Sequence, residues 1–246
     1  MGHARNHRLR VLAEQSAKST NEYGDMRKDV SVYELQLVEL KNDKSVLSNV
    51  KSEIERGQAK AFLIPKYMPY VEGIIAADQK VNDDIVTTIM TWCFDAQMFI
   101  EGLKIAEFAL KHDLDMPDAF SRDTASVVAE EISNTALNVM KQGQTFDLSV
   151  LLKAESLTEH ANMHDQIRAK LFCAIGRCYY QIEDWKSAVT YMTKAIGRKD
   201  NIGCKEELRK AEKALSKQLE EQKHLLKNTN GTAVVDDFGS NVIASS

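Results

Sequence analysis

Apolar residues recur at three- and four-residue steps through most of the chain, a spacing typical of amphipathic helices. The first such pattern covers residues 4–18, where Leu9, Val11 and Leu12 form a narrow apolar stripe. Residues 19–24, which are of turn-forming types and end in glycine, interrupt it. The pattern therefore predicts a short N-terminal helix, joined to the rest of the chain by a flexible segment.

A second apolar pattern runs from about residue 30 to residue 56 at heptad-like steps. Its apolar positions are Tyr33, Leu37, Leu40, Leu47 and Ile54. Lys44 and Lys51 interrupt the stripe, and Gly57 follows as a helix stop. The pattern predicts one long helix. Two interpretations stay open: the helix lies along the protein's own core, or its stripe packs against neighbouring subunits.

The next segment contains two of the three prolines and leads into a new helix. Pro65 and Pro69 restrict the backbone, so we expect Tyr67 and Tyr70 on a turn that enters a helix. Another helix is expected to begin at residues 82–84, Asn-Asp-Asp. A short polar side chain caps a helix start, and carboxylates favour its positive end.

Further helical patterns continue as far as residue 227. They cover residues 99–112, 121–142, 147–160, 165–198 as a helix pair, and 203–227. In the pair, Gly176 and Ala188 take positions where tetratricopeptide-type helices cross, and Gly102 fits the same template. The two copies do not keep the period of about 34 residues that a tandem array needs. We therefore expect helix pairs inside a bundle.

The composition agrees with an all-α fold. The 246 residues are 43% hydrophobic and include only 3 prolines and 11 glycines, so long helices are favoured over a turn-rich all-β chain. No run of eighteen apolar residues occurs, so no membrane segment is expected. Four scattered cysteines without a CxxC pair predict reduced, buried thiols in a cytoplasmic protein.

Charge is distributed unevenly along the chain. The formal net charge is −4, which argues against a protein that coats nucleic acid non-specifically. Residues 1–28 nevertheless carry an excess of cations over carboxylates, whereas the rest is acidic. The side chains that could contact DNA phosphates are Arg5, His7, Arg8, Arg10, Lys18, Arg27 and Lys28. So few cations would bind weakly in one copy, but copies held together would act jointly. The alternative is a solvated, frayed terminus.

Candidate catalytic chemistry is sparse. The sequence contains no P-loop, HExxH, zinc-spaced Cys/His set or GxSxG motif, and we predict no catalytic residue, metal or cofactor. The carboxylates of Asp83, Asp84, Asp95 and Glu101 could in principle serve a two-metal nuclease. Asp83 and Asp84, however, stand where a helix start favours negative charge, so capping is the preferred interpretation.

Several short motifs follow one another in an order that resembles a known family. They are Arg8-Leu-Arg-Val-Leu12, Tyr33-Glu-Leu-Gln-Leu-Val38, Pro69-Tyr-Val-Glu-Gly73, Asp83-Asp-Ile-Val-Thr-Thr-Ile-Met-Thr-Trp92 and Gly102-Leu-Lys-Ile-Ala106. In order and spacing the chain resembles the small terminase subunit of peduovirus-type tailed phages, over about residues 5–215.

The resemblance implies a DNA-recognition subunit of a phage packaging complex. Its partners would be double-stranded phage DNA, further copies in a ring, and a large subunit that holds the ATPase and nuclease, in the cytoplasm of the infected bacterium. Together with the charge, spacing and composition of the segments, it divides the chain into a basic DNA-binding arm (1–28), a long oligomerisation helix (29–62), a helical bundle (63–227) and a disordered tail (228–246). The tail lacks the basic character that such proteins can have, which shifts DNA binding to residues 3–28. The alternative is a helical protein-interaction adapter that does not bind DNA.

Overall fold

All regular secondary structure in this computed structural model is helical over the residues that it describes, namely 2–20, 30–117 and 121–230. The predicted all-α fold is confirmed. The helices are α1 (His3–Thr20), α2 (Val30–Ser48), α3 (Glu53–Ala77), α4 (Asp84–Asp95), α5 (Phe99–Lys111), α6 (Thr124–Lys141), α7 (Leu148–Thr158), α8 (Asp165–Gln181), α9 (Trp185–Arg198) and α10 (Lys205–Asn230).

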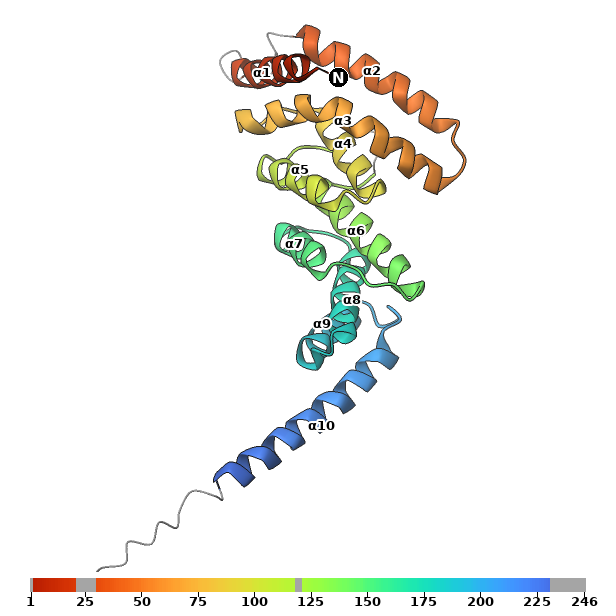
Figure 1. The fold of residues 1–246 in the computed structure, drawn as a ribbon, viewed down its shortest axis with the longest axis vertical. Coiled ribbons are helices and arrows are strands. Elements are labelled where there is room, and N and C mark those ends of the chain that lie inside the picture. Colours follow the sequence, from red (N-terminus) through yellow and green to blue (C-terminus); the bar gives the residue numbers. More distant parts are fainter. Residues whose placement is uncertain (1, 21–29, 118–120, 231–246) are drawn as a thin grey trace, which may run out of the picture.

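The helices are stacked along one long axis (Figure 1). α1, α2 and α3 lie together at one end of the molecule, and α4 to α9 continue the stack. α10 packs on α8 and α9 through its first turns and then projects from the opposite end. The predicted disordered tail begins within α10 at residue 228, and residues 231–246 lie outside the described ranges.

The sequence predicts one long helix over residues 30–56, but the structure has two helices there, so the prediction is wrong after Ser48. α2 ends at Ser48, and α3 begins at Glu53 with Ser52 as its N-cap. Gly57 is not a helix stop but lies inside α3, where an added Cβ would stand 2.9 Å from the backbone oxygen of Asp95. The glycine is explained by this close approach of two helices rather than by a turn.

Pro65 and Pro69 lie inside α3, so the predicted turn at this point is also wrong. An interior proline costs a helix about 3 kcal/mol through a lost hydrogen bond and a steric clash. Tyr67 and Tyr70 are fully buried on this helix instead of being presented from a turn. We attribute the helical state to this burial, because packing an apolar face outweighs local propensity.

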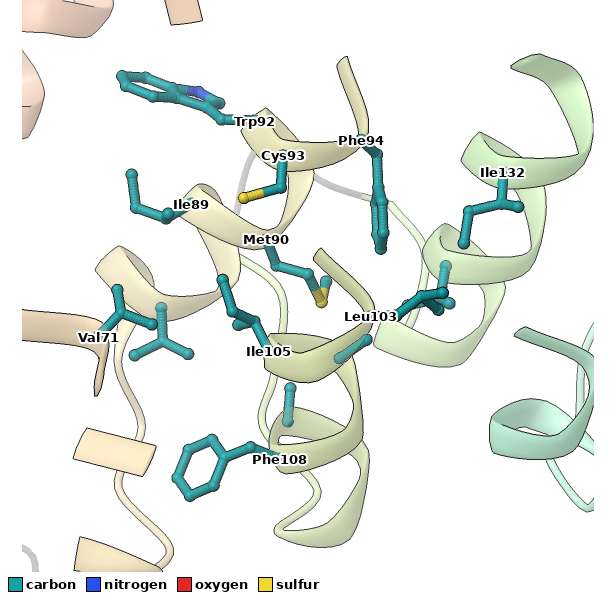
Figure 2. Close-up of a cluster of buried hydrophobic side chains, with 14 of the residues drawn as sticks. Val71, Ile89, Met90, Trp92, Cys93, Phe94, Leu103, Ile105, Phe108 and Ile132 are labelled. Carbon is teal, nitrogen blue, oxygen red and sulfur yellow. The ribbon is translucent and has the colours of Figure 1, made fainter. Parts of the chain in front are cut away.

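The centre of the core lies between α4 and α5 (Figure 2). Met90 and Phe94 of α4 point toward Leu103 and Ile105 of α5, and the same core cluster extends from α1 to α8. Gly102 permits the close contact, because a Cβ there would stand 2.6 Å from the Phe94 ring. α4 and α5 thus lie where the sequence predicts a helix start at residues 82–84 and a helix over 99–112.

The second half of the chain follows the predicted elements closely. Asp123, Asp147 and Asp184 each cap a helix by accepting a backbone N–H bond. α8 and α9 form the predicted pair, and a Cβ at Gly176 would stand 2.7 Å from Cγ of Met192. The likeness of this pair to tetratricopeptide repeats stays a prediction.

The cysteines and the helix lengths bear on two further expectations. All four cysteines are free and buried, as predicted, and burial raises the pKa of Cys93 to about 12. Within the described ranges, none of the helices combines the length and the apolar character that crossing a bilayer requires.

Candidate nucleic-acid interface

α1 packs along α3 and belongs to the helical body rather than to a separate arm. Its contact face consists of small residues, because Ala13 and Ala17 are buried and Ser16 is nearly so. At Gly73 of α3, an added Cβ would stand 2.3 Å from the backbone oxygen of Arg10. The expected flexible joint at 21–29 lies outside the described residues. Docking on α3 therefore corrects the expectation of an arm for residues 3–20.

The basic side chains of α1 are exposed, although His7 and Arg10 also line a groove toward α3 and α5. Arg5, His7, Arg8 and Arg10 are all exposed. Among the described residues, none of the three arginines takes part in an ion pair, so their positive charge is available to a partner. A helix that is held along its length presents these charges in a fixed arrangement.

The remaining predicted DNA-binding residues are less favourably placed. Lys18 is paired with Glu14, with 2.5 Å between its Nζ and the carboxylate. This contact lowers the pKa of the Glu14 carboxyl through the hydrogen bond and the charge of Lys18. Arg27 and Lys28 lie outside the described residues. The three arginines are consequently the cations of this face that the structure leaves unpaired.

A groove of about 510 Å³ lies beside the contact of α1 with α3 and is lined by residues of α1, of the middle of α3 and of the start of α5. Asn6, His7 and Arg10 line one side, opposite Glu72 of α3 and Glu101 of α5. Carboxylates thus face the cations across this groove. A polyanion is better accommodated on the outward side of α1, at Arg5 and Arg8, than in the groove.

The predicted oligomerisation residues do not share one exposed stripe. Leu40 and Leu47 are buried in the chain's own core, while Tyr33 and Leu37 are partly buried against it. Ile54 is 76% exposed but lies on α3, beyond the turn that separates it from α2. For Leu40 and Leu47, the first of the two interpretations is therefore the right one: they lie along the protein's own core. The exposed apolar face of α2 consists of Leu35, Val38 and Val46.

α2 is held to α3 by a polar cluster that the sequence patterns do not reveal. Asp43 accepts hydrogen bonds from the hydroxyl of Tyr67 and from Nζ of Lys66, the latter at 2.8 Å. Glu39 also pairs with Lys66, at 2.9 Å. Burial, together with Asp43, raises the pKa of the Tyr67 hydroxyl, so it remains a donor. The cluster fixes which face of α2 points outward.

The candidate nuclease carboxylates do not converge. Asp83 is buried and accepts bonds from the backbone N–H of Ile85 at 2.9 Å and from the Tyr70 hydroxyl at 2.7 Å. Its predicted capping role is confirmed. Asp95 is paired with Lys60 at the other end of α4. Across the described part of the chain, no group of three or more ligating side chains could hold a metal ion.

Comparisons with known proteins match this chain to a family of phage proteins. A family model described as "Phage small terminase subunit" matches residues 37–166. The matched region contains α3 to α7 and most of α2, and it ends just inside α8. No solved structure matches the chain.

Two relatives carry related names. The "Terminase, endonuclease subunit" of Escherichia phage P2 is 30% identical over 219 residues, which cover 89% of this chain and 87% of the relative. The "Probable terminase, endonuclease subunit" of Haemophilus phage HP1 is 21% identical over 165 residues, or 66% of this chain and 59% of the relative.

Proposed function

Since this chain belongs to the phage small terminase subunit family and has a role in packaging phage DNA in the infected host cell, we propose that it recognises the duplex where packaging starts. It does so as a ring of identical subunits in the host cytoplasm. The ring in turn regulates a large subunit that carries the ATPase and the nuclease.

The exposed cations of α1 are the observation that carries this proposal. Arg5, Arg8 and Arg10 lie on a docked helix without ion pairs among the described residues, although the whole chain is acidic. His7, Lys18, Arg27 and Lys28 extend the same basic segment (1–28). Three arginines bind weakly in one copy, and a ring raises their effective concentration at the duplex.

The contact between copies is assigned to the segment 29–62. Leu35, Val38 and Val46 are exposed on one face of α2, and Ile54 is exposed at the start of α3. Apolar side chains exposed in such a row are typical of protein–protein contacts. This assignment keeps the helix that was predicted for oligomerisation but moves the contact to its opposite face. Tyr33 and Leu37 lie on the inward face of α2, where they pack against the core.

Removing the three arginine charges tests the proposal. The Arg5→Gln/Arg8→Gln/Arg10→Gln variant is expected to bind duplex DNA at least about tenfold more weakly. The slope of log affinity against log salt concentration is expected to decrease in magnitude by about 0.9 for each phosphate contact that is lost. Fluorescence anisotropy over a salt series measures both quantities. The control replaces three exposed lysines on other helices, Lys104, Lys186 and Lys213, by glutamine. Equal loss in both variants, or none in either, contradicts the assignment to α1. Capture of the large subunit without DNA binding supports the adapter alternative.

We assign DNA cutting to the large subunit, although the names of both relatives contain the word endonuclease. The purified chain is expected to leave duplex DNA intact in Mg²⁺ or Mn²⁺, because a two-metal site needs convergent carboxylates and Asp83 is occupied as a helix cap. Gel analysis of plasmid DNA checks this. Cleavage by the wild type that is lost in Asp95→Asn would overturn the assignment.

A further inference from the structure

A second group of cations surrounds a hollow at the turn between α2 and α3. The hollow has a volume of about 420 Å³ and is lined by Lys44, Leu47, Ser48, Arg56, Lys60 and Trp92. These residues come from three helices, α2, α3 and α4. Leu47 and Trp92 are buried and form an apolar floor, and in Figure 2 the indole of Trp92 points away from Phe94 and Ile132.

Two of the three cations lack a carboxylate partner. Lys60 is paired with Asp95. Lys44 donates to the hydroxyl of Thr88 at 3.1 Å, and Arg56 donates to the backbone oxygen of Val50 at 2.8 and 3.1 Å. Within the described ranges, neither Lys44 nor Arg56 forms an ion pair. Two positive charges therefore meet in one hollow without a paired carboxylate.

The surrounding charges do not cancel this excess within the hollow itself. Burial lowers the pKa of Lys44, and the charge of Asp84 opposes that effect. Glu53 and Glu131 lie in the adjacent cleft, which shares Arg56 and Lys60 with the hollow. Burial and the charge of Asp95 raise the pKa of the Glu131 carboxyl. The acidic groups thus stand beside the hollow and do not line it.

Arg56 is also held in place by the turn. Its guanidinium donates to the oxygen of Val50 through Nε and Nη2, whereas Nη1 donates no hydrogen bond to the residues that the structure describes. Guanidinium groups suit phosphate because their N–H donors form a rigid fork. The ammonium group of Lys44, which lines the same hollow, supplies a second charged donor. A phosphate bound in the hollow would receive charged donors from both side chains.

We propose that the hollow of Lys44, Arg56 and Lys60 binds a phosphate group, supplied by the backbone of the duplex that α1 contacts. This source rests on the proposed function. α1 and the α2–α3 turn lie at the same end of the molecule, opposite α10 (Figure 1). A phosphate bound there fixes the orientation of the duplex on the subunit, since backbone contacts position a protein on DNA without reading its sequence.

The test uses the full-length chain with Lys44→Gln, alone and combined with Arg56→Gln. In the double variant, the slope of log affinity against log salt concentration is expected to decrease in magnitude by about 0.9 for each lost contact, or by roughly 2 for both. Its affinity for the duplex is expected to fall at least about tenfold. Lys104→Gln/Lys186→Gln removes two exposed lysines elsewhere and is expected to behave as wild type. Because Arg56 also holds the turn, the single Lys44 variant, with an unchanged melting temperature, decides the outcome if the double variant unfolds.

A second arm distinguishes a nucleic-acid backbone from a free nucleotide. ATP is titrated into each variant in a Trp185→Phe background, so that the fluorescence of Trp92, which lines the hollow, reports binding. ATP binding that is lost in Lys44→Gln, with duplex binding unchanged, assigns the phosphate to a free nucleotide. Wild-type affinity for both ligands in Lys44→Gln overturns the proposal. If the wild type binds ATP at the hollow but no duplex, the proposed function fails while the phosphate site stands; if it binds neither, both fail.

Discussion

Replacing Gly73 by alanine is expected to destabilise the protein by about 1–3 kcal/mol, the usual cost of overpacking a close contact. The added Cβ would stand 2.3 Å from the backbone oxygen of Arg10 and 2.8 Å from Cβ of Ala13. Neither atom belongs to a flexible side chain, so α1 has to move away from α3. Urea unfolding followed by circular dichroism measures the loss.

The same substitution is expected to weaken DNA binding, because the arginines of α1 lose their fixed arrangement. Gly197→Ala is the matched control: Gly197 lies in α9 with nothing within 4 Å of an added Cβ. Alanine there should stabilise the helix by up to about 1 kcal/mol and leave DNA binding unchanged. A Gly73→Ala protein with wild-type stability and DNA affinity would show that α1 is not docked as described.

Replacing Asp83 by alanine is expected to cost about 2–4 kcal/mol of unfolding free energy. Loss of an N-cap costs about 1 kcal/mol, and loss of a buried hydrogen bond to a carboxylate costs about 1.5–3 kcal/mol more. Asp83 serves both purposes, because it caps α4 and accepts the hydroxyl of Tyr70 within the core. Chemical denaturation at neutral pH measures the difference.

Asp83→Asn is the conservative control, since asparagine also caps helices and keeps an accepting oxygen. Its expected loss is clearly smaller than that of alanine. Tyr70→Phe removes the donor, so Asp83→Ala should cost less in that background than in the wild type. An alanine variant as stable as the wild type would refute the double role of Asp83.

Most helices could be predicted from local patterns because their ends are marked by local chemistry. Asp83 and Asp147 precede helices that begin one residue later, as expected from capping. The failure lies between residues 30 and 77. A helix through Pro65 and Pro69 is locally unfavourable, and only the burial of residues such as Tyr67 and Tyr70 makes it stable.

The sequence predicts which residues near the candidate site are charged, but not how the helices that carry them are arranged. A heptad stripe assumes one continuous helix, and the turn at 49–52 separates Ile54 from the face that contains Leu40 and Leu47. The exposed face of α2 depends on Asp43, which is joined to Lys66 and Tyr67 of another helix. No periodicity within α2 could reveal that contact.

By itself, the sequence determined the all-α class, the position of most helices and the basic character of the first segment, because periodicity, capping residues and charge are properties of neighbouring residues. Only the tertiary structure decided that α1 docks at Gly73, that Leu40 and Leu47 face inward, and that Lys44, Arg56 and Trp92 share one hollow. These relations join residues that are distant in sequence. They follow from how helix faces pack, which local patterns do not contain.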